Sequence, residues 1–226
     1  MQLWVTSPLI NSVLLLESSV TSNLTSVCQT ARTLSSVACK NHNFVSSTTC
    51  WKKSAWHVLA LSWRAPRWVL LLAPLLPQGG LLWTPEDTTP YECDGLTAYR
   101  QRPLCVALPE TYEQVQQVLR ACHALAVPVV ARGAGTGLSG GAMPHGDGVT
   151  LSLAKFNRIL SVDAYSRTAV VQSGVRNLAI SEAAAPLGLY YAPDPSSQIA
   201  CTIGGNVAEN SGGVHCLKYG LTVHNV

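Results

Sequence analysis

A run of five glycines in nine residues, from Gly133 to Gly141, constrains this 226-residue chain more than any other feature. Glycine reaches positive φ angles without steric cost, and without a Cβ its backbone amides can approach a ligand closely. The apolar segment 126–131 leads directly into the run and is typical of a buried strand. A glycine loop after a buried strand favours a backbone cradle for an anion over a plain surface turn.

The residues around the loop exclude two common nucleotide motifs. Residues 135–140 fit the GxGxxG pattern, but dinucleotide-binding folds require a helix directly afterwards. The following segment, 142–148, contains two glycines and a proline and shows no helical period. A P-loop requires a lysine where Gly141 stands. We therefore expect the loop to bind an anion through its own amides, with Thr136 and Ser139 as additional donors.

A second glycine-rich segment, residues 192–213, mixes small polar residues with isoleucine and valine. This mixture is typical of a coil packed against a ligand, because a solvated loop would carry more charge. An ordinary series of turns fits the same residues equally well, so both interpretations stay open. The side chains suited to binding the edges of a heterocycle are those of Ser197, Thr202, Asn206 and Asn210.

From about residue 70 the sequence predicts an α+β domain with a mixed sheet and flanking helices. Thr111 and Gln114 have the spacing of a capping box, and apolar residues at helical spacing follow as far as Leu125. A second helix is expected over residues 178–187, ending near Gly188. The expected strands are residues 104–108, 126–131, 148–153, 159–162 and 168–172.

Residues 1–69 form an atypical segment, distinct from the domain at residues 70–226. All six tryptophans lie at or before Trp83, and Glu17 is the only acidic residue up to that point. The segment shows no sustained period and no motif. It is either a disordered extension or a stretch outside the domain's natural reading frame. We favour the second explanation, because a selected linker would be polar and charged.

Composition also excludes several classes of protein. The net charge of +3, without a basic stripe, argues against a nucleic-acid partner. The eight cysteines form no CxxC and no zinc-finger spacing, so we expect reduced thiols and no metal. Arginines and prolines interrupt the apolar stretch 56–76, which is too short between them for a transmembrane segment. The chain begins without a secretory signal, and we expect a cytoplasmic protein.

Four sequence runs resemble the FAD-linked oxidases whose flavin domain is of the PCMH type, named after p-cresol methylhydroxylase. Within that family they are most similar to the D subunits of bacterial glycolate oxidases. The resemblance implies two α+β subdomains that hold FAD between them, here an incomplete PCMH-type FAD-binding fold. The runs are PYECDGLTAYR at 90–100, VPVVARGAGTGLSGGAMP at 127–144, GVRNLAISEAAAPLGLYYAPDPSSQIACTIGGNVAENSGG at 174–213 and VHCLKYGLTVHN at 214–225.

The resemblance also implies which residues bind the cofactor. The glycine loop would give its amides to the pyrophosphate, and the second segment would line the isoalloxazine ring and the ribityl chain. The loop residues are Gly133, Ala134, Gly135, Thr136, Gly137, Leu138, Ser139 and Gly140. The residues of the second segment are Pro193, Ser197, Thr202, Gly204, Gly205, Asn206, Ala208 and Asn210.

The family chemistry implied is oxidation of a 2-hydroxy acid, of the glycolate or D-lactate type, by hydride transfer to FAD. Electrons would pass to companion flavin and iron–sulfur subunits, and such a complex would suit the cytoplasmic face of the inner membrane. The alternative is a flavin-binding fragment, or a decayed gene product, without turnover. Both hypotheses stay open.

No catalytic residue is assigned from the sequence. In the family, substrate and the catalytic base belong to a cap domain beyond the region that corresponds to this chain, so we expect the chain to be inactive alone. His215 and His224 are suitable bases by residue type, but they lie in a segment that the family uses for structure near the cofactor. Arg100, Arg102 and Arg132 can attract a carboxylate, although an exposed arginine is usually a solvated charge.

Overall fold

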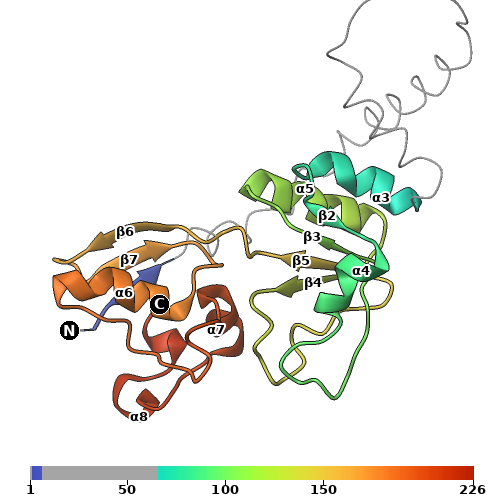
Figure 1. Ribbon diagram of the computed structural model, residues 1–226. Coiled ribbons are helices and arrows are strands. Elements are labelled where there is room, and N and C mark those ends of the chain that lie inside the picture. The colour runs from blue at the N-terminus through green and yellow to red at the C-terminus, as the bar shows by residue number, and fades with distance from the viewer. Residues whose placement is uncertain (1, 7–65) are drawn as a thin grey trace, which may run out of the picture. The chain divides into compact units, whose positions relative to one another are not determined.

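The computed structural model describes residues 2–6 and 66–226. Residues 71–226 form one compact unit, and residues 2–6 belong to it (Figure 1). The helices and strands in chain order are β1 (Trp4–Thr6), α3 (Arg67–Leu72), η2 (Ala73–Leu75), β2 (Leu81–Leu82), α4 (Pro85–Thr88), η3 (Thr89–Tyr91), β3 (Cys105–Ala107), α5 (Tyr112–Ala124), β4 (Val129–Arg132), β5 (Val149–Ser152), β6 (Ile159–Asp163), β7 (Thr168–Val171), α6 (Asn177–Ala184), η4 (Ala185–Leu187), α7 (Ile203–Glu209), α8 (Cys216–Tyr219) and η5 (Thr222–His224).

The first sheet is mixed and contains four strands in the order β2-β3-β5-β4. The strands β3 and β4 both pair in parallel with β5, whereas β2 pairs antiparallel with β3 at the edge. Every residue of β3 and β5 is buried, as expected for parallel strands that are covered on both faces. This sheet therefore provides a rigid base for the glycine loop, which leaves it directly after β4.

Helix α5 begins at the predicted capping box. The backbone amide of Gln114 donates to Thr111 Oγ1 at 3.3 Å, and the amide of Thr111 donates to Gln114 Oε1 at 3.2 Å. The side chains of Val115, Val118 and Cys122 are buried, as their helical spacing predicted. The start of this helix is confirmed, but its apolar face only in part, because Leu119 and Leu125 of the predicted face are exposed.

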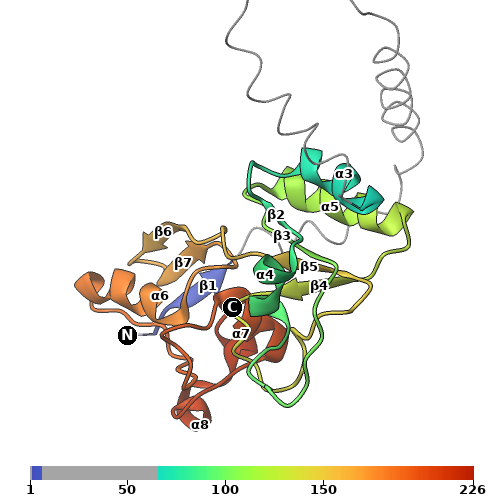
Figure 2. The same ribbon diagram turned by 45° about the vertical axis from the view of Figure 1, so that its right-hand side comes forward.

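The second sheet contains three strands in the order β1-β7-β6. Strand β7 pairs in parallel with β1 and antiparallel with β6. Helix α6 lies across one face of this sheet in both views (Figures 1 and 2), and its residues Ile180 and Ala184 share a core with Leu3, Val5 and Val171. The helix ends as predicted, because Gly188 takes the left-handed conformation that closes η4 (φ 69°).

Residues 2–6 belong to the fold, which their composition did not predict. Leu3 and Val5 are buried while Trp4 between them is 46% exposed, which is the alternation of a strand. The side chain of Gln2 donates to Asn225, and the amide of Val5 donates to the Asn225 carbonyl oxygen at 3.0 Å. Residues 7–65 of the predicted atypical segment lie outside the described residues, so the prediction for them stays a prediction.

The structure differs from the sequence expectations at two further points. Residues Ile203–Glu209 form helix α7, where we expected a coil, because buried Ile203 and Asn206 anchor a segment whose glycines disfavour a helix. The predicted strands divide into two mixed sheets rather than one, in line with the two subdomains that the resemblance implied. Among the described helices none has the length and apolar character needed to cross a membrane.

Candidate functional site

The glycine loop after β4 and the segment around α7 line one cavity of about 500 Å³. Eleven of the predicted cofactor-binding residues line it: Gly133, Ala134, Gly135, Thr136, Gly137, Ser197, Thr202, Gly204, Gly205, Asn206 and Ala208. Five others do not: Leu138, Ser139, Gly140, Pro193 and Asn210. Lining residues that the sequence analysis did not name for the cofactor include Arg132, Gly141, Ser173, Pro195, Cys201 and Glu209. The structure thus brings together two segments that are separated by about sixty residues.

The loop itself has no helix between residues 133 and 148, as predicted. Gly135 takes a φ of +72°, a conformation that residues with a side chain rarely adopt. At Gly133 an added Cβ would collide with the hydroxyl of Thr202, at the N-terminus of α7. The loop approaches α7 closely because it has no side chain at that position.

Arg132, the last residue of β4, lies directly before the glycine loop and supports it with its side chain. Its guanidinium donates to the carbonyl oxygen of Cys93 at 2.8 Å and to that of Ala142 at 3.5 Å, and it lies 5.5 Å from the ring centre of Tyr91. A Cβ at Gly135 would collide with this guanidinium. Arg132 therefore binds the backbone of Cys93 and that of Ala142 at the end of the loop, and its guanidinium is not free to bind a substrate carboxylate.

A second support comes from the segment before β3. Gly95 packs so tightly on the loop that a Cβ there would lie 2.7 Å from the Gly137 carbonyl oxygen and 2.8 Å from that of Thr136. The amide of Leu96 donates to Asp94 Oδ1 at 2.9 Å, which holds this turn in shape. Gly95 was not predicted as a site residue, since a single glycine in a sequence gives no sign of what packs against it.

A pair of buried asparagines holds α7 in place. The Nδ2 of Asn206 donates to Asn177 Oδ1 at 2.8 Å, and Asn177 Nδ2 donates to the Pro193 carbonyl oxygen at 3.0 Å. Both asparagines are buried, so a lost partner would leave a costly unsatisfied group. Asn206 therefore positions the cavity wall. Asn177 was not predicted as a site residue, because a lone asparagine at the start of a helix is usually a surface residue.

Two hydroxyls of the cavity have no hydrogen-bond partner among the described residues. They are Thr202 Oγ1 and Ser173 Oγ, and both are buried. Buried polar groups in proteins are nearly always satisfied, so an unpartnered hydroxyl in a cavity indicates a ligand that supplies the partner. Four other buried polar atoms, Asp94 Oδ2, Tyr112 Oη, Thr150 Oγ1 and Tyr191 Oη, also have no partner among the described residues and do not line the cavity, so the two hydroxyls support a binding site through their place in the cavity wall.

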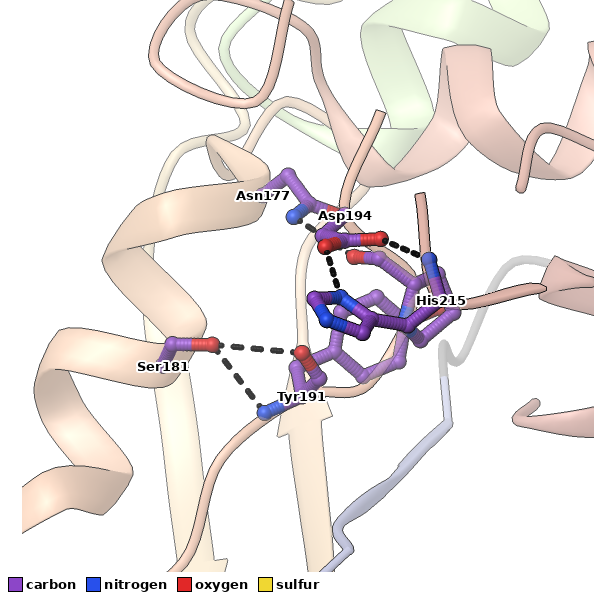
Figure 3. A network of polar contacts seen from close by, with 6 residues as sticks. Asn177, Ser181, Tyr191, Asp194 and His215 are labelled. Atoms are coloured by element: carbon purple, nitrogen blue, oxygen red, sulfur yellow. Dashed lines mark hydrogen bonds and ion pairs between the residues drawn. The ribbon is translucent and has the colours of Figure 1, made fainter. Parts of the chain in front are cut away.

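Beside the cavity, Asp194 holds the segment that leads into α8 (Figure 3). Its Oδ2 lies 2.6 Å from Nδ1 of His215, and its Oδ1 accepts from the His215 amide at 3.3 Å. The amide of Tyr191 donates to Ser181 Oγ at 3.0 Å, and this bond fixes the segment that contains Tyr191 and Asp194 to α6. The side chain of His215 is 62% exposed and does not line the cavity. Its contacts give it a structural place next to the site.

We expect the Asp194–His215 contact to lose its contribution to stability in acid. Burial raises the pKa of Asp194, but the hydrogen bonds and charge of His215 outweigh it and leave the pKa below its usual value of 3.8. A lowered carboxyl pKa contributes stability above pH 3.8 that disappears as the pH falls through the folded-state pKa. The free energy of unfolding, measured with urea at pH 7 and pH 3, should therefore fall further in the wild type than in Asp194→Asn, by up to about 1 kcal/mol. An equal fall in both proteins would contradict this assignment.

The remaining candidates from the sequence are the cysteines and His224. Within the described residues no group of three or more histidine, cysteine or acidic side chains is placed to hold a metal ion. The five described cysteines are free thiols, and burial raises the pKa of Cys105 to about 12. His224 accepts the Leu221 amide on Nδ1 at 3.1 Å, away from the cavity. Cys28, Cys39 and Cys50 lie outside the described residues.

Comparison with known proteins identifies the domain that contains this cavity. A family model described as FAD binding domain matches residues 103–226, more than half of the chain and nearly all of the cavity's surroundings. The chain belongs to the FAD binding domain family. FAD is therefore the cofactor that the residues of the cavity have to fit.

Two curated relatives match the same region. The glycolate oxidase subunit GlcD of Escherichia coli K12 is 64% identical over 158 residues, which are 70% of this chain and 32% of that protein. The D-2-hydroxyglutarate dehydrogenase of Xanthomonas citri pv. viticola is 40% identical over 154 residues, or 68% of this chain and 33% of that protein. The chain thus spans about a third of the length of these relatives.

The fold agrees with the family. The crystal structure of p-cresol methylhydroxylase with substrate bound matches 63% of this chain and 29% of its own chain, with a TM-score of 0.54 and 23% identity. At this identity the likeness concerns the fold alone. The predicted PCMH-type FAD-binding fold, with mixed sheets and flanking helices, is confirmed.

The residues of the cavity fit FAD. A Cβ at Gly133 would collide with the hydroxyl of Thr202 and one at Gly204 with Ser173, so both glycines are required by the close packing of the segments that form the cavity wall. The loop offers amide donors suited to an anion, and the unpartnered hydroxyls of Thr202 and Ser173 offer polar partners opposite it. Anion and heterocycle therefore each find suitable groups in the cavity.

Proposed function

We propose that this chain binds FAD in the cavity and is the cofactor-binding part of a flavin-dependent oxidoreductase for 2-hydroxy acids. The observation that carries the proposal is the convergence of the glycine loop and the α7 segment on two buried hydroxyls without partners. The names of the relatives, a glycolate oxidase subunit and a D-2-hydroxyglutarate dehydrogenase, support this substrate class.

The two walls of the cavity have different tasks in this proposal. Loop amides from Gly133 to Gly137 bind the pyrophosphate, and Ser139 is a further donor at the rim. Thr202 and Ser173 bind the flavin or ribityl part through their hydroxyls. Bound FAD supplies the chemistry of accepting a hydride from a carbinol carbon. Of the predicted residues that do not line the cavity, Pro193 accepts a hydrogen bond from Asn177, and Asn210 accepts one from the amide of Val223.

No catalytic base is proposed in the described residues. The charged side chains on the cavity wall are those of Arg132 and Glu209, and Arg132 is bound to backbone carbonyl oxygens. We propose that the role of this chain is to bind and orient the cofactor and to shield it from water. We also propose that it works with companion subunits, because the relative from Escherichia coli is itself a subunit. Flavin and iron–sulfur companions and a place at the cytoplasmic face of the inner membrane stay predictions.

The proposal is tested by the visible spectrum of the purified chain. After incubation with FAD and gel filtration, we expect a retained flavin band near about 450 nm. Bleaching of this band by glycolate or D-lactate under anaerobic conditions would show turnover by this chain. A retained band without bleaching would favour the flavin-binding module without turnover. Failure to retain FAD would contradict the proposed function.

A further inference from the structure

Glu209, the last residue of α7, extends its carboxylate to the glycine loop. Both carboxylate oxygens lie 2.7 Å from Ser139 Oγ, so this hydroxyl donates to the carboxylate. A Cβ at Gly141 would lie 2.8 Å from Glu209 Oε1, and one at Gly137 would lie 3.3 Å from it. The carboxylate therefore occupies the space that two glycines of the predicted pyrophosphate cradle leave open.

Glu209 forms no ion pair within the described part of the chain, although the guanidinium of Arg132 belongs to the same cavity wall. The ion pairs within the described part of the chain join Arg100 to Glu92, Lys155 to Glu110 and His215 to Asp194. Glu209 takes part in none of them. Its place at the C-terminus of α7 adds the partial negative charge of the helix end to that of the carboxylate. A carboxylate that forms no ion pair with the described residues thus faces a loop that is suited to binding negative groups.

We propose that Glu209 is a built-in competitor of the cofactor's pyrophosphate and limits the affinity of the glycine loop for FAD. The inference rests on the proposed function. The pyrophosphate is itself negative and needs the donors of the loop, including the Ser139 hydroxyl that now serves Glu209. To bind, it must displace the carboxylate and remain beside it. Because Glu209 is exposed, solvent screens the repulsion, and the effect on affinity is moderate.

If Glu209 instead favours FAD binding, the same measurement changes in the opposite direction. A carboxylate beside a nucleotide can accept hydrogen bonds from ribose hydroxyls and so favour binding. Neutralising Glu209 would then weaken FAD binding, whereas neutralising a competitor strengthens it. The two roles therefore differ in the sign of one measurement.

The test is a fluorescence titration of the full chain and of Glu209→Gln with FAD. The amide keeps the size of the side chain but removes its charge. We expect Glu209→Gln to bind FAD about three- to tenfold more tightly at low ionic strength. This gain should shrink in about 0.5 M NaCl, because salt screens charge repulsion. Riboflavin, which has no phosphate, should bind both proteins equally.

Glu182→Gln is the matched control, because Glu182 is an exposed glutamate of α6 that does not line the cavity. It removes the same charge and should leave FAD affinity unchanged. When the wild type binds FAD, either of two results would overturn this inference and leave the proposed function standing. One is equal or weaker FAD binding by Glu209→Gln, and the other is an equal gain in affinity for Glu182→Gln. If the wild type fails to bind FAD, the proposed function fails and this inference fails with it.

Discussion

Replacing Gly95 by alanine is expected to weaken FAD binding by at least about tenfold while the protein stays folded. The new Cβ would lie 2.7 Å and 2.8 Å from the carbonyl oxygens of Gly137 and Thr136, so the backbone of the glycine loop has to move. Gly95 itself does not line the cavity, and its effect therefore reports on the loop alone. The affinity is measured by flavin fluorescence, and circular dichroism checks the fold.

Thr97→Ala is the matched control for this experiment, since Thr97 lies two residues further along the same segment with an exposed side chain. It should bind FAD as the wild type does. Unchanged affinity in Gly95→Ala would show that the position of the loop does not govern cofactor binding, and the cradle would have to be sought elsewhere in the cavity.

The largest expected loss of stability follows removal of the Phe156 side chain. It is 1% exposed, and its ring lies 5.2 Å from that of Tyr112, on the first turn of α5. Its backbone accepts from the amide of Gly174 at 2.8 Å and donates to the Leu153 carbonyl oxygen at 3.0 Å. Phe156→Ala should lower the free energy of unfolding by about 3–5 kcal/mol, because the cavity it leaves adds to the lost burial.

Urea denaturation of Phe156→Ala and of Tyr165→Ala provides the comparison. Tyr165 is also an aromatic residue, but it is 98% exposed in the turn between β6 and β7. Its removal should change the free energy of unfolding by no more than about 0.5 kcal/mol. Similar losses in the two variants would mean that Phe156 does not fill a close-packed site.

Local signals in the sequence were sufficient for a large part of the fold. The capping box at Thr111 and Gln114 and the apolar face of α5 could be predicted, because both depend on residues within four positions of one another. The strands β3 to β7 are short apolar runs and were found for the same reason, whereas the two-residue strand β2 was not predicted. Strand β1 was missed, since its partner β7 lies more than 160 residues away in the sequence.

The candidate site was predictable where a segment carries its own signal, and Ser197, Thr202 and Asn206 line the cavity together with the predicted glycines. The glycines from Gly133 to Gly137 were identified because their freedom of conformation is a property of each residue alone. Arg132, Gly95 and Asn177 support the site through contacts with distant segments. Their residue types fit many surface roles, and only the folded chain shows which contacts they make.

The contacts of Arg132 bear on the kinetics of cofactor binding. By holding carbonyl oxygens before β3 and at the far end of the glycine loop, the guanidinium turns the loop into a closed ring of backbone. The conformational entropy of closing that ring is lost when the chain folds rather than when a ligand arrives. Association then needs no ordering of the loop backbone, so its observed rate should rise in proportion to the FAD concentration, without the plateau that a slow rearrangement of this backbone would impose.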